Sequence, residues 1–453
     1  MFYPHASIGR CAVLAALLVA QTLTAATPEF SNRSWVRHQS GNSPEPDLLQ
    51  EGAPEPTADQ SLWDRDLLTG NWWGYREKLA ADGVTINVSY VADALGNVAG
   101  GDSRGFRYTS STGVDLNLDL EKLADLKGWR FHTTGVWRYG RNLSQQVIGN
   151  VFTAAQVFGG QNARLYNFYL QKTTDDERWV FKFGRLGQGD DFLSSPLYWN
   201  YVNNGFDGNP VAVFFNAPME AYPNATWGAM MEGKPVDDWY FKLGVYGADT
   251  DLNRNSAHGL DWTFRFNKGA FLIGQGGYRP NSTPDATGLP GAYSVGWYYV
   301  TGQFALQRNP AQEVTGTYGG YVMLEQMLFR EGGPGTTQGL TAWSALLLAP
   351  PDRAEMPFFI NGGLVYKGLF PGRTEDTTAF GFIYGRFSSD LRTAQQAAGL
   401  PLQSYEAVLE FTHRIVITPW FYVQPDMQVI LNPGGTGNLG TALVLGAQVG
   451  INF

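Results

Sequence analysis

Two neighbouring carboxylates, Asp190 and Asp191, follow the basic residues Lys182 and Arg185 in the stretch KFGRLGQGDDF. A carboxylate pair could act as acid and base in glycoside hydrolysis, so a secreted hydrolase is one class of function to weigh. In that chemistry the two groups face each other at about 5–9 Å, a geometry that adjacency alone does not provide. The sequence also lacks the H-E-x-x-H pattern of zinc hydrolases. We therefore expect these charged side chains to serve in binding or in lining a passage, and we do not expect the protein to be an enzyme.

A second group of polar residues lies in WRFHTTGVWRYGR, residues 129–141. If this stretch is a strand with Trp129 and Phe131 on an apolar face, alternation puts the residues between them on a polar face. The residues on that polar face are Arg130, His132, Thr134 and Arg138, and Lys182 and Arg265 point inward by the same argument. The five histidines of the chain are scattered without metal-ligand spacing, so we expect neither a metal nor another cofactor.

Aromatic residues form a third group, with Trp137 and Trp199 as candidate stacking platforms for a ligand. The alternative role for both is packing at a strand end or within a loop. Trp199 belongs to residues 194–228, which contain eight aromatic residues and six asparagines but only two charged residues. This stretch has no lasting period, so it predicts a long and irregular connection.

The elements that must position these groups are strands, because a period of two runs through most of the chain from residue 84 onward. In VDLNLDL (114–120) and in VTINVSY (84–90), apolar residues alternate with polar ones. We count about seventeen such segments. They begin near residues 84, 114, 129, 164, 178, 226, 239, 260, 270, 293, 318, 340, 357, 378, 404, 420 and 441.

The final segment, LVLGAQVGINF, indicates whether the apolar faces of these strands meet lipid or a protein core. Its apolar residues alternate without a break up to Phe453. Aromatic residues also cluster at strand ends, as they do in the girdles of transmembrane barrels. A closed barrel with both ends of the chain on one side needs an even number of strands, and seventeen is odd. One of the segments predicted near residues 260, 270 and 293 is therefore not a strand of the barrel. We predict an all-β fold: an antiparallel transmembrane β-barrel of about sixteen strands.

The chain before the barrel divides into three parts. Residues 1–26, with the single charge of Arg10, an apolar run and small residues before Thr27, predict a signal peptide. The only cysteine, Cys11, lies within it. Residues 27–62, poor in large apolar side chains, predict a flexible arm. Residues 63–83 predict a short helix, and residues 84–453 are the predicted barrel domain.

Charge and hydropathy exclude two classes of protein. The formal net charge of −9 argues against a nucleic-acid partner, because phosphate binding requires a basic surface. No run beyond residue 26 approaches the roughly 18 apolar residues of a membrane-spanning helix, so a helical membrane protein is excluded.

Several motifs in order resemble the carbohydrate-selective porins of the OprB family. They include LLTGNWWGYREKLAADGVTINVSYVADALGNVAGG (67–101), FGRLGQGDDFLSSPLYWNYVNNGFDGNP (183–210) and AYPNATWGA (221–229). Further matches are GLPGAYSVGWYYVTG (288–302), YVMLEQMLFRE (321–331) and YKGLFPGR (366–373). The resemblance implies a sixteen-stranded barrel in a Gram-negative outer membrane that lets glucose and related sugars diffuse into the periplasm. It leans toward a monomer.

The resemblance also implies partners and a constriction. The expected partners are sugars, the lipid bilayer, lipopolysaccharide and the assembly machinery that reads the terminal Phe453. The constriction residues that it suggests are Arg138, Arg185, Asp190 and Asp191. Strand parity adds Arg130 and Lys182 as further candidates, and Trp137 and Trp199 are the candidate stacking platforms. For each charged candidate, the alternative is a charge that only pairs across the lumen. A porin without sugar preference is the alternative function.

The long connection fits this interpretation if it turns inward. A loop with so many rings and so little charge would bury its apolar surface best against the inner wall. Its asparagines could then satisfy backbone groups that have no ladder partner. We therefore predict that residues 194–228 narrow the pore.

Overall fold

The computed structural model describes residues 61–453 apart from residues 207 and 284–285. The expected signal peptide, residues 1–26, lies outside the described residues. Of the expected arm, only residues 61 and 62 are described.

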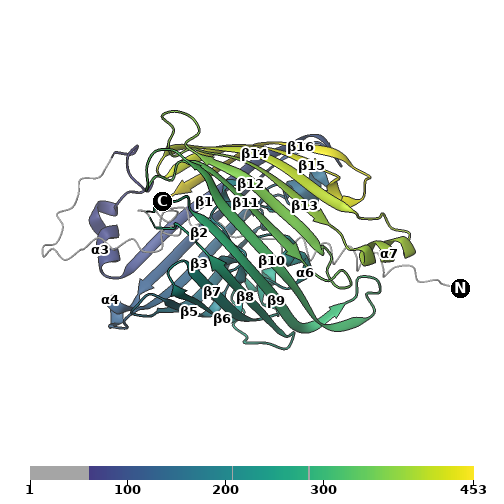
Figure 1. Cartoon of the computed structure of the whole chain (residues 1–453), viewed down its shortest axis with the longest axis horizontal. Helices are drawn as coiled ribbons and strands as arrows, with labels where there is room; N and C mark the ends of the chain where they lie inside the picture. The colour runs from purple at the N-terminus through teal and green to yellow at the C-terminus, as the bar shows by residue number, and fades with distance from the viewer. Residues whose placement is uncertain (1–60, 207, 284–285) are drawn as a thin grey trace.

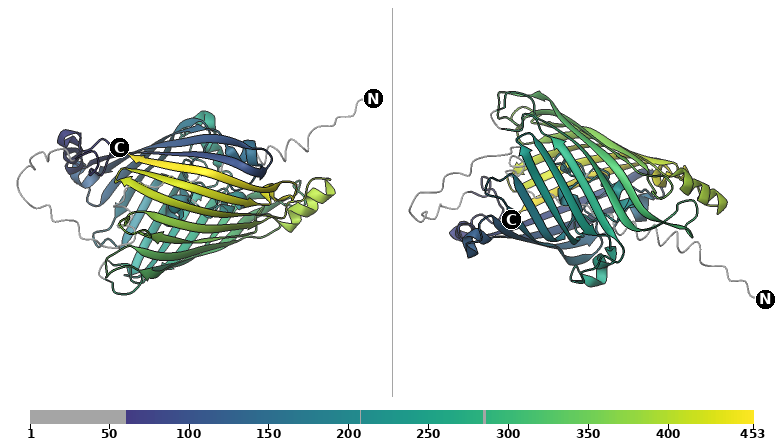
Figure 2. Two further views of the ribbon diagram at one scale, coloured as in Figure 1. Left: turned by 90° about the horizontal axis from the view of Figure 1, so that it is seen from above. Right: turned by 60° about the horizontal axis from the view of Figure 1, so that its bottom comes forward.

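The described residues form sixteen antiparallel strands that close into one barrel (Figure 1). Each strand pairs with its neighbours in the chain, and β1 pairs with β16 to close the ring (Figure 2). The first eight strands are β1 Val84–Gly101, β2 Gly105–Asp119, β3 Trp129–Gly140, β4 Asn162–Thr173, β5 Trp179–Leu186, β6 Thr226–Val236, β7 Trp239–Gly247 and β8 Ala270–Tyr278. The others are β9 Gly291–Ala305, β10 Glu313–Arg330, β11 Gly339–Leu348, β12 Phe358–Lys367, β13 Thr377–Arg386, β14 Tyr405–Thr418, β15 Phe421–Leu431 and β16 Gly440–Asn452.

The predicted strand near residue 260 is wrong. Residues 261–266 carry no strand hydrogen bonding and belong to the connection between β7 and β8. Their alternation has another cause, because Trp262 and Phe264 pack against Trp227 while Trp262 also contacts Phe168. An extended segment that lays aromatic rings on a barrel wall has the same period as a strand. The start of β2 was also predicted nine residues too late.

The helices are short. The predicted N-terminal helix is confirmed as α3 Tyr75–Ala81, preceded by the 3-10 turn η1 Trp72–Gly74. Within the part of the chain that is described, no helix is long and apolar enough to cross a bilayer. The other helices and turns are α4 Leu120–Ala124, η2 Ser144–Ile148, α5 Gln188–Asp191, η3 Tyr198–Asn200, α6 Ala212–Asn216, η4 Thr250–Asn253, η5 Asn255–Ala257, α7 Ser389–Ala397 and η6 Pro433–Gly435.

The wall has an apolar outer face and a more polar inner face, as the alternation predicts. On β16, Leu445 is 42% exposed on the outside, whereas Gln448 is 3% exposed on the inside. Both chain ends of the barrel lie at the end that carries α3, called here the α3 end (Figure 1). The long connections after β3, β5 and β7 therefore lie at the opposite end.

Two of these connections fold into the barrel, which confirms the prediction for the longest one. They are the β3–β4 loop (141–161) and the β5–β6 loop (187–225). Tyr198, Tyr201 and Phe206 of the β5–β6 loop are each 0% exposed. They pack against Trp343 of β11, so the loop reaches the far wall of the barrel. The last three residues of the predicted stretch, 226–228, belong to β6.

Candidate functional site

The β5–β6 loop is attached to the far wall by side chains of β14. The carboxylate of Glu410 accepts hydrogen bonds from the backbone nitrogens of Val202 and Asn203, at 2.6 and 3.0 Å. Glu406 accepts in the same way from Val151 and Phe152 of the β3–β4 loop, at 2.7–2.9 Å. Both carboxylates are 0% exposed. Because buried backbone donors require acceptors, these two residues hold the loops inside the barrel.

Asparagines complete the attachment, as the sequence predicts. The amide nitrogen of Asn209 donates to the backbone oxygens of Gly189, Phe192 and Leu193, at 2.9–3.1 Å. Asn216 donates to the backbone oxygen of Met356 and accepts from its nitrogen, at 2.8 and 2.9 Å. Such side chains replace the ladder hydrogen bonds that an irregular segment lacks.

Three of the predicted site residues meet at the near end of this loop. Lys182 of β5 forms an ion pair with Asp191, with 2.6 Å between Nζ and the carboxylate oxygen. The Lys182 and Asp191 side chains are 17% and 9% exposed, and Asp190 beside them is exposed. The inner-face position predicted for Lys182 agrees with this contact.

Lys242 of β7 extends this charged cluster, although the sequence analysis did not single it out. Its Nζ donates to the backbone oxygen of Asp191 at 2.9 Å and lies 3.6 Å from the Glu232 carboxylate. The parity of WYFKLGVYG, with Trp239 and Phe241 on the outer face, could have placed Lys242 inside. Positive and negative side chains therefore alternate around Asp191.

Next to this cluster, β2 to β4 supply further polar groups. His132 of β3 lies beside Asn117 and Thr134, at 2.5 and 3.0 Å from its two ring nitrogens. Thr134 donates to Asp115 at 2.6 Å. The ring of Tyr169 lies between the two groups, 5.0 Å from the His132 ring and 5.4 Å from Lys182 Nζ. The inner wall here offers hydrogen-bond donors and acceptors around the aromatic ring of Tyr169.

Arg138 and Arg130 lie apart from that cluster. Arg138 is 1% exposed, and its guanidinium carbon lies 4.8 Å from the ring centre of Tyr222. The β3–β4 loop covers it so closely that a Cβ on Gly159 would lie 2.1 Å from Nη1. Arg130 is exposed at the α3 end of β3. The structure thus buries one of these arginines beneath the loops and leaves the other at the barrel mouth.

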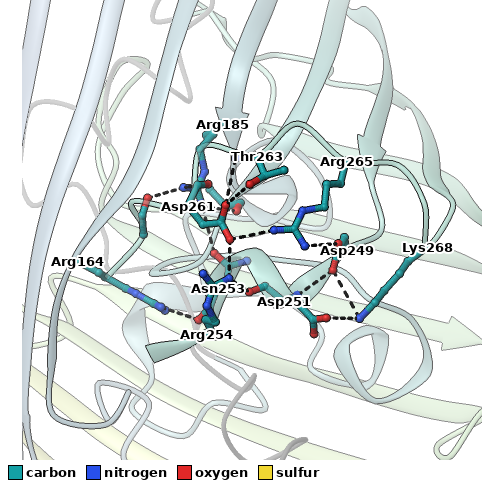
Figure 3. Close-up of polar contacts among 12 residues, drawn as sticks. Arg164, Arg185, Asp249, Asp251, Asn253, Arg254, Asp261, Thr263, Arg265 and Lys268 are labelled. Atoms are coloured by element: carbon teal, nitrogen blue, oxygen red, sulfur yellow. Dashed lines mark hydrogen bonds and ion pairs between the residues drawn. The ribbon is translucent and has the colours of Figure 1, made fainter. Parts of the chain in front are cut away.

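Arg185 does not line the lumen. It has the parity of Phe183, which is 46% exposed on the outer face of β5, and Arg185 itself is 1% exposed. The β7–β8 loop (248–269) covers it, and its guanidinium donates to the backbone oxygens of Gly259, Asp261 and Ala225 (Figure 3). The short distance in sequence to Asp191 was misleading, because Lys182 and not Arg185 points to that carboxylate.

The β7–β8 loop seals the wall where β5 ends early. The backbone nitrogen of Leu165 on β4 donates to the backbone oxygen of His258 at 3.0 Å, and Arg164 donates to the backbone oxygen of Asn253 at 2.6 Å. Gly259 has φ of +73°, and a Cβ there would lie 1.9 Å from the oxygen of Leu165. Only glycine fits this close approach.

Ion pairs stabilise this loop internally (Figure 3). Asp261 pairs with Arg265 at 3.2 Å and with Arg254, while Lys268 pairs with Asp251 at 2.6 Å. Hydrogen bonds from Thr263 and Arg254 hold the pKa of Asp261 below its usual value. Arg265 was expected on the inner face of a strand, and this expectation is wrong because the segment is a loop.

The two tryptophans proposed as stacking platforms lie on different sides of the barrel wall. Trp137 lies on the outer face of β3, opposite in parity to the inward Val136, and is 61% exposed. This position suits its alternative role as an aromatic residue at the barrel surface. Trp199 lies inside, half-buried, and packs against the cluster of Val136, Tyr166, Tyr222 and Ala225.

Arg414 of β14 faces Trp199 and is a further residue that the sequence analysis missed. Its Nη2 donates to the backbone oxygen of Trp199 at 2.5 Å, and its Nε donates to Gln424 at 2.8 Å. Its guanidinium also lies 4.5 Å from the ring centre of Tyr422. Strand parity with Glu406 and Glu410 could have placed it inside the barrel.

One catalytic motif in the sequence and the possibility of a metal site can be compared with the described part of the chain. Residues 101–105 read G-x-S-x-G, the pattern of a hydrolase nucleophile elbow. They form the turn between β1 and β2, whereas an elbow joins a strand to a helix. Among the described residues, no group of His, Cys, Asp and Glu side chains could hold a metal ion.

Comparison with known proteins gives consistent matches. The family model described as "Carbohydrate-selective porin, OprB family" matches residues 103–453. Porin B of Pseudomonas aeruginosa is 28% identical over 430 residues, which cover 88% of this chain and 92% of Porin B. The putative porin QuiX of Acinetobacter baylyi is 24% identical, with 86% and 94% covered. The high-pH structure of Pseudomonas putida OprB has a TM-score of 0.81 at 25% identity, covering 87% of this chain and all of that one.

Proposed function

This chain belongs to the carbohydrate-selective porin family OprB, and we propose that its β5–β6 loop forms the constriction that selects sugars. The protein is an outer-membrane channel for the diffusion of carbohydrates, and it is not an enzyme. The observation that carries the proposal is the attachment of this loop across the lumen, through Glu410 to the far wall.

The chemistry of the proposed constriction suits neutral hydroxyl-rich solutes. Sugars need fixed donors and acceptors, and an aromatic ring can contact their C–H faces. Lys182, Asp190 and Asp191 provide charges of both signs, and Trp199 provides a half-buried ring. A lining that alternates in sign gives no net attraction for one kind of ion, in contrast to a ring of like charges. We propose glucose and related sugars as the preferred solutes.

We also propose how the protein is exported and how it is assembled in the outer membrane. Residues 1–26 would direct secretion through the inner membrane, and the alternating β16 with Phe453 would be read by the outer-membrane assembly machinery. The exposed apolar outer face would contact the bilayer, with lipopolysaccharide in its outer leaflet.

Liposome swelling tests the proposed selectivity. Purified protein in liposomes should admit glucose faster than neutral amino acids of similar size. Equal swelling rates for both classes would identify a general porin and would contradict the proposed sugar preference.

A further inference from the structure

The seam that closes the barrel has a step at the α3 end. Pairing between β1 and β16 begins at Ser89 and Asn452, so residues 84–88 of β1 continue beyond it. The last strand contact is the hydrogen bond from the Phe453 nitrogen to the Val88 oxygen, at 2.9 Å. Beyond this point, backbone groups on that edge of β1 need partners from another part of the chain.

The segment of residues 61–81 supplies those partners on both sides of the seam. On the β16 side, the Leu68 nitrogen donates to the Asn452 oxygen at 2.8 Å. Arg76 of α3 spans the step itself. Its Nη1 donates to the Ile86 oxygen of β1 at 3.2 Å, and its Nη2 donates to the backbone oxygen of Phe453 at 3.0 Å.

A third contact ties the same segment to the turn before β15. The indole Nε1 of Trp420 donates to the Leu62 oxygen at 2.8 Å. The Trp420 oxygen in turn accepts from the Asn452 nitrogen at 2.9 Å, so this turn also holds the end of β16. Residues 61–81 therefore contact three separate strands or turns at one end of the barrel.

The local backbone aims Arg76 at the seam. Trp72, Trp73 and Gly74 all have positive φ, at 52°, 56° and 91°, which turns the chain sharply just before α3. For two tryptophans this conformation is costly, and it persists only where surrounding contacts hold it. Those contacts include the Arg76 guanidinium, 4.1 Å from the ring centre of Trp72, and its bond to Thr69 at 3.1 Å.

We propose that residues 61–81 are a clasp that locks the β1–β16 seam after the barrel has closed. The complete docking site exists only once β16 lies beside β1, because Arg76 contacts both strands at once. Docking of the clasp therefore follows closure. It covers the end of β16 at the α3 end, where C and α3 lie side by side in Figures 1 and 2.

The test compares R76A with K78A, which removes the same charge from an exposed position of the same helix. Each protein is refolded from urea into detergent, so that assembly in the cell does not limit the comparison. Hydrogen–deuterium exchange at residues 84–90 and 449–453 should be roughly tenfold faster in R76A than in wild type or K78A. Exchange in β8 to β12 should be unchanged.

A milder variant keeps the test decisive if R76A does not refold. W420F removes only the bond to Leu62, and it should accelerate exchange at residues 449–453 while leaving β8 to β12 unchanged. Equal exchange at the seam in wild type and in the refolded clasp variants would overturn the proposal. Sugar permeation of W420F should match wild type, so failure of the clasp is distinguishable from failure of the proposed selectivity.

Discussion

Lys182 and Arg185 illustrate how strongly one residue's role depends on strand parity. They lie three positions apart on β5, and therefore on opposite faces of the wall. Lys182 faces inward and pairs with Asp191, whereas Arg185 faces outward and fastens the β7–β8 loop. One is a candidate for selectivity, and the other is a structural clamp.

Substitutions at these two positions should separate the two roles. K182Q should leave Asp191 without its partner and shift the reversal potential in a KCl gradient toward cation selectivity. R185A should leave the reversal potential unchanged but lower the free energy of unfolding by about 3 kcal/mol, because several buried hydrogen bonds are lost. A shift in reversal potential for R185A with no loss of stability would contradict these assignments.

Glu220 of the β5–β6 loop should make stability depend on pH. Burial raises its pKa from about 4.5 to about 7, although the charges of Arg164 and Arg185 oppose the shift. Below pH 4.5 it is protonated in both states. Between pH 4.5 and 7 it is ionised in the unfolded chain but neutral in the folded one, so stability falls as pH rises.

The E220Q variant isolates this contribution. Relative to E220Q, the wild type should lose about 3 kcal/mol of unfolding free energy between pH 4.5 and pH 7.5. The measurement is urea unfolding in detergent at a series of pH values. Parallel curves for the two proteins would show that Glu220 is not buried in its neutral form.

At the level of elements, the period of two predicted most of the wall, because lipid and lumen impose opposite polarity on alternate residues. It failed at residues 261–266, where an extended loop lays its rings on the outer surface. Local alternation cannot distinguish a hydrogen-bonded strand from such a segment. The odd strand count revealed the error and narrowed it to the segments near residues 260, 270 and 293, but it did not show which of the three was wrong.

The site was only partly predictable for a related reason. Parity placed Lys182, His132 and Arg138 on the inner face, and the structure agrees. It could not show that the β3–β4 loop buries Arg138, because parity says nothing of how a loop folds. Nor could it show that Glu406 and Glu410 anchor both loops, since those anchoring contacts join residues more than 200 positions apart. Pairing between distant segments is set by the closed topology and has no local signal.

The anchor at Glu410 gives a prediction about the loop as an element. E410A should leave the backbone nitrogens of Val202 and Asn203 without their acceptor and loosen the β5–β6 loop. Single-channel recordings should then show noisier current and a higher mean conductance than wild type. The exposed E313Q variant of β10 serves as control, and identical traces for E410A and E313Q would refute the anchoring role.

The whole molecule combines a lipid-facing barrel with a filling made from its own loops. The barrel alone, at about sixteen strands, is wide enough to leave an aqueous channel. The two inward loops fold into that space, and we propose that Trp199 and the charges around Asp191 face the solute path there. Selectivity is therefore expected to reside in the loops, and stability in the wall and its seam.

The central claim is that the β5–β6 loop confers the sugar preference. The most direct measurement is ion current through single channels in planar bilayers with graded glucose, for wild type and for a variant with residues 194–221 replaced by a short Gly-Ser linker. We predict that sugar interrupts the wild-type current, and that the variant conducts several-fold more and loses the interruption. Equal conductance and equal interruption by sugar in both proteins would contradict the account.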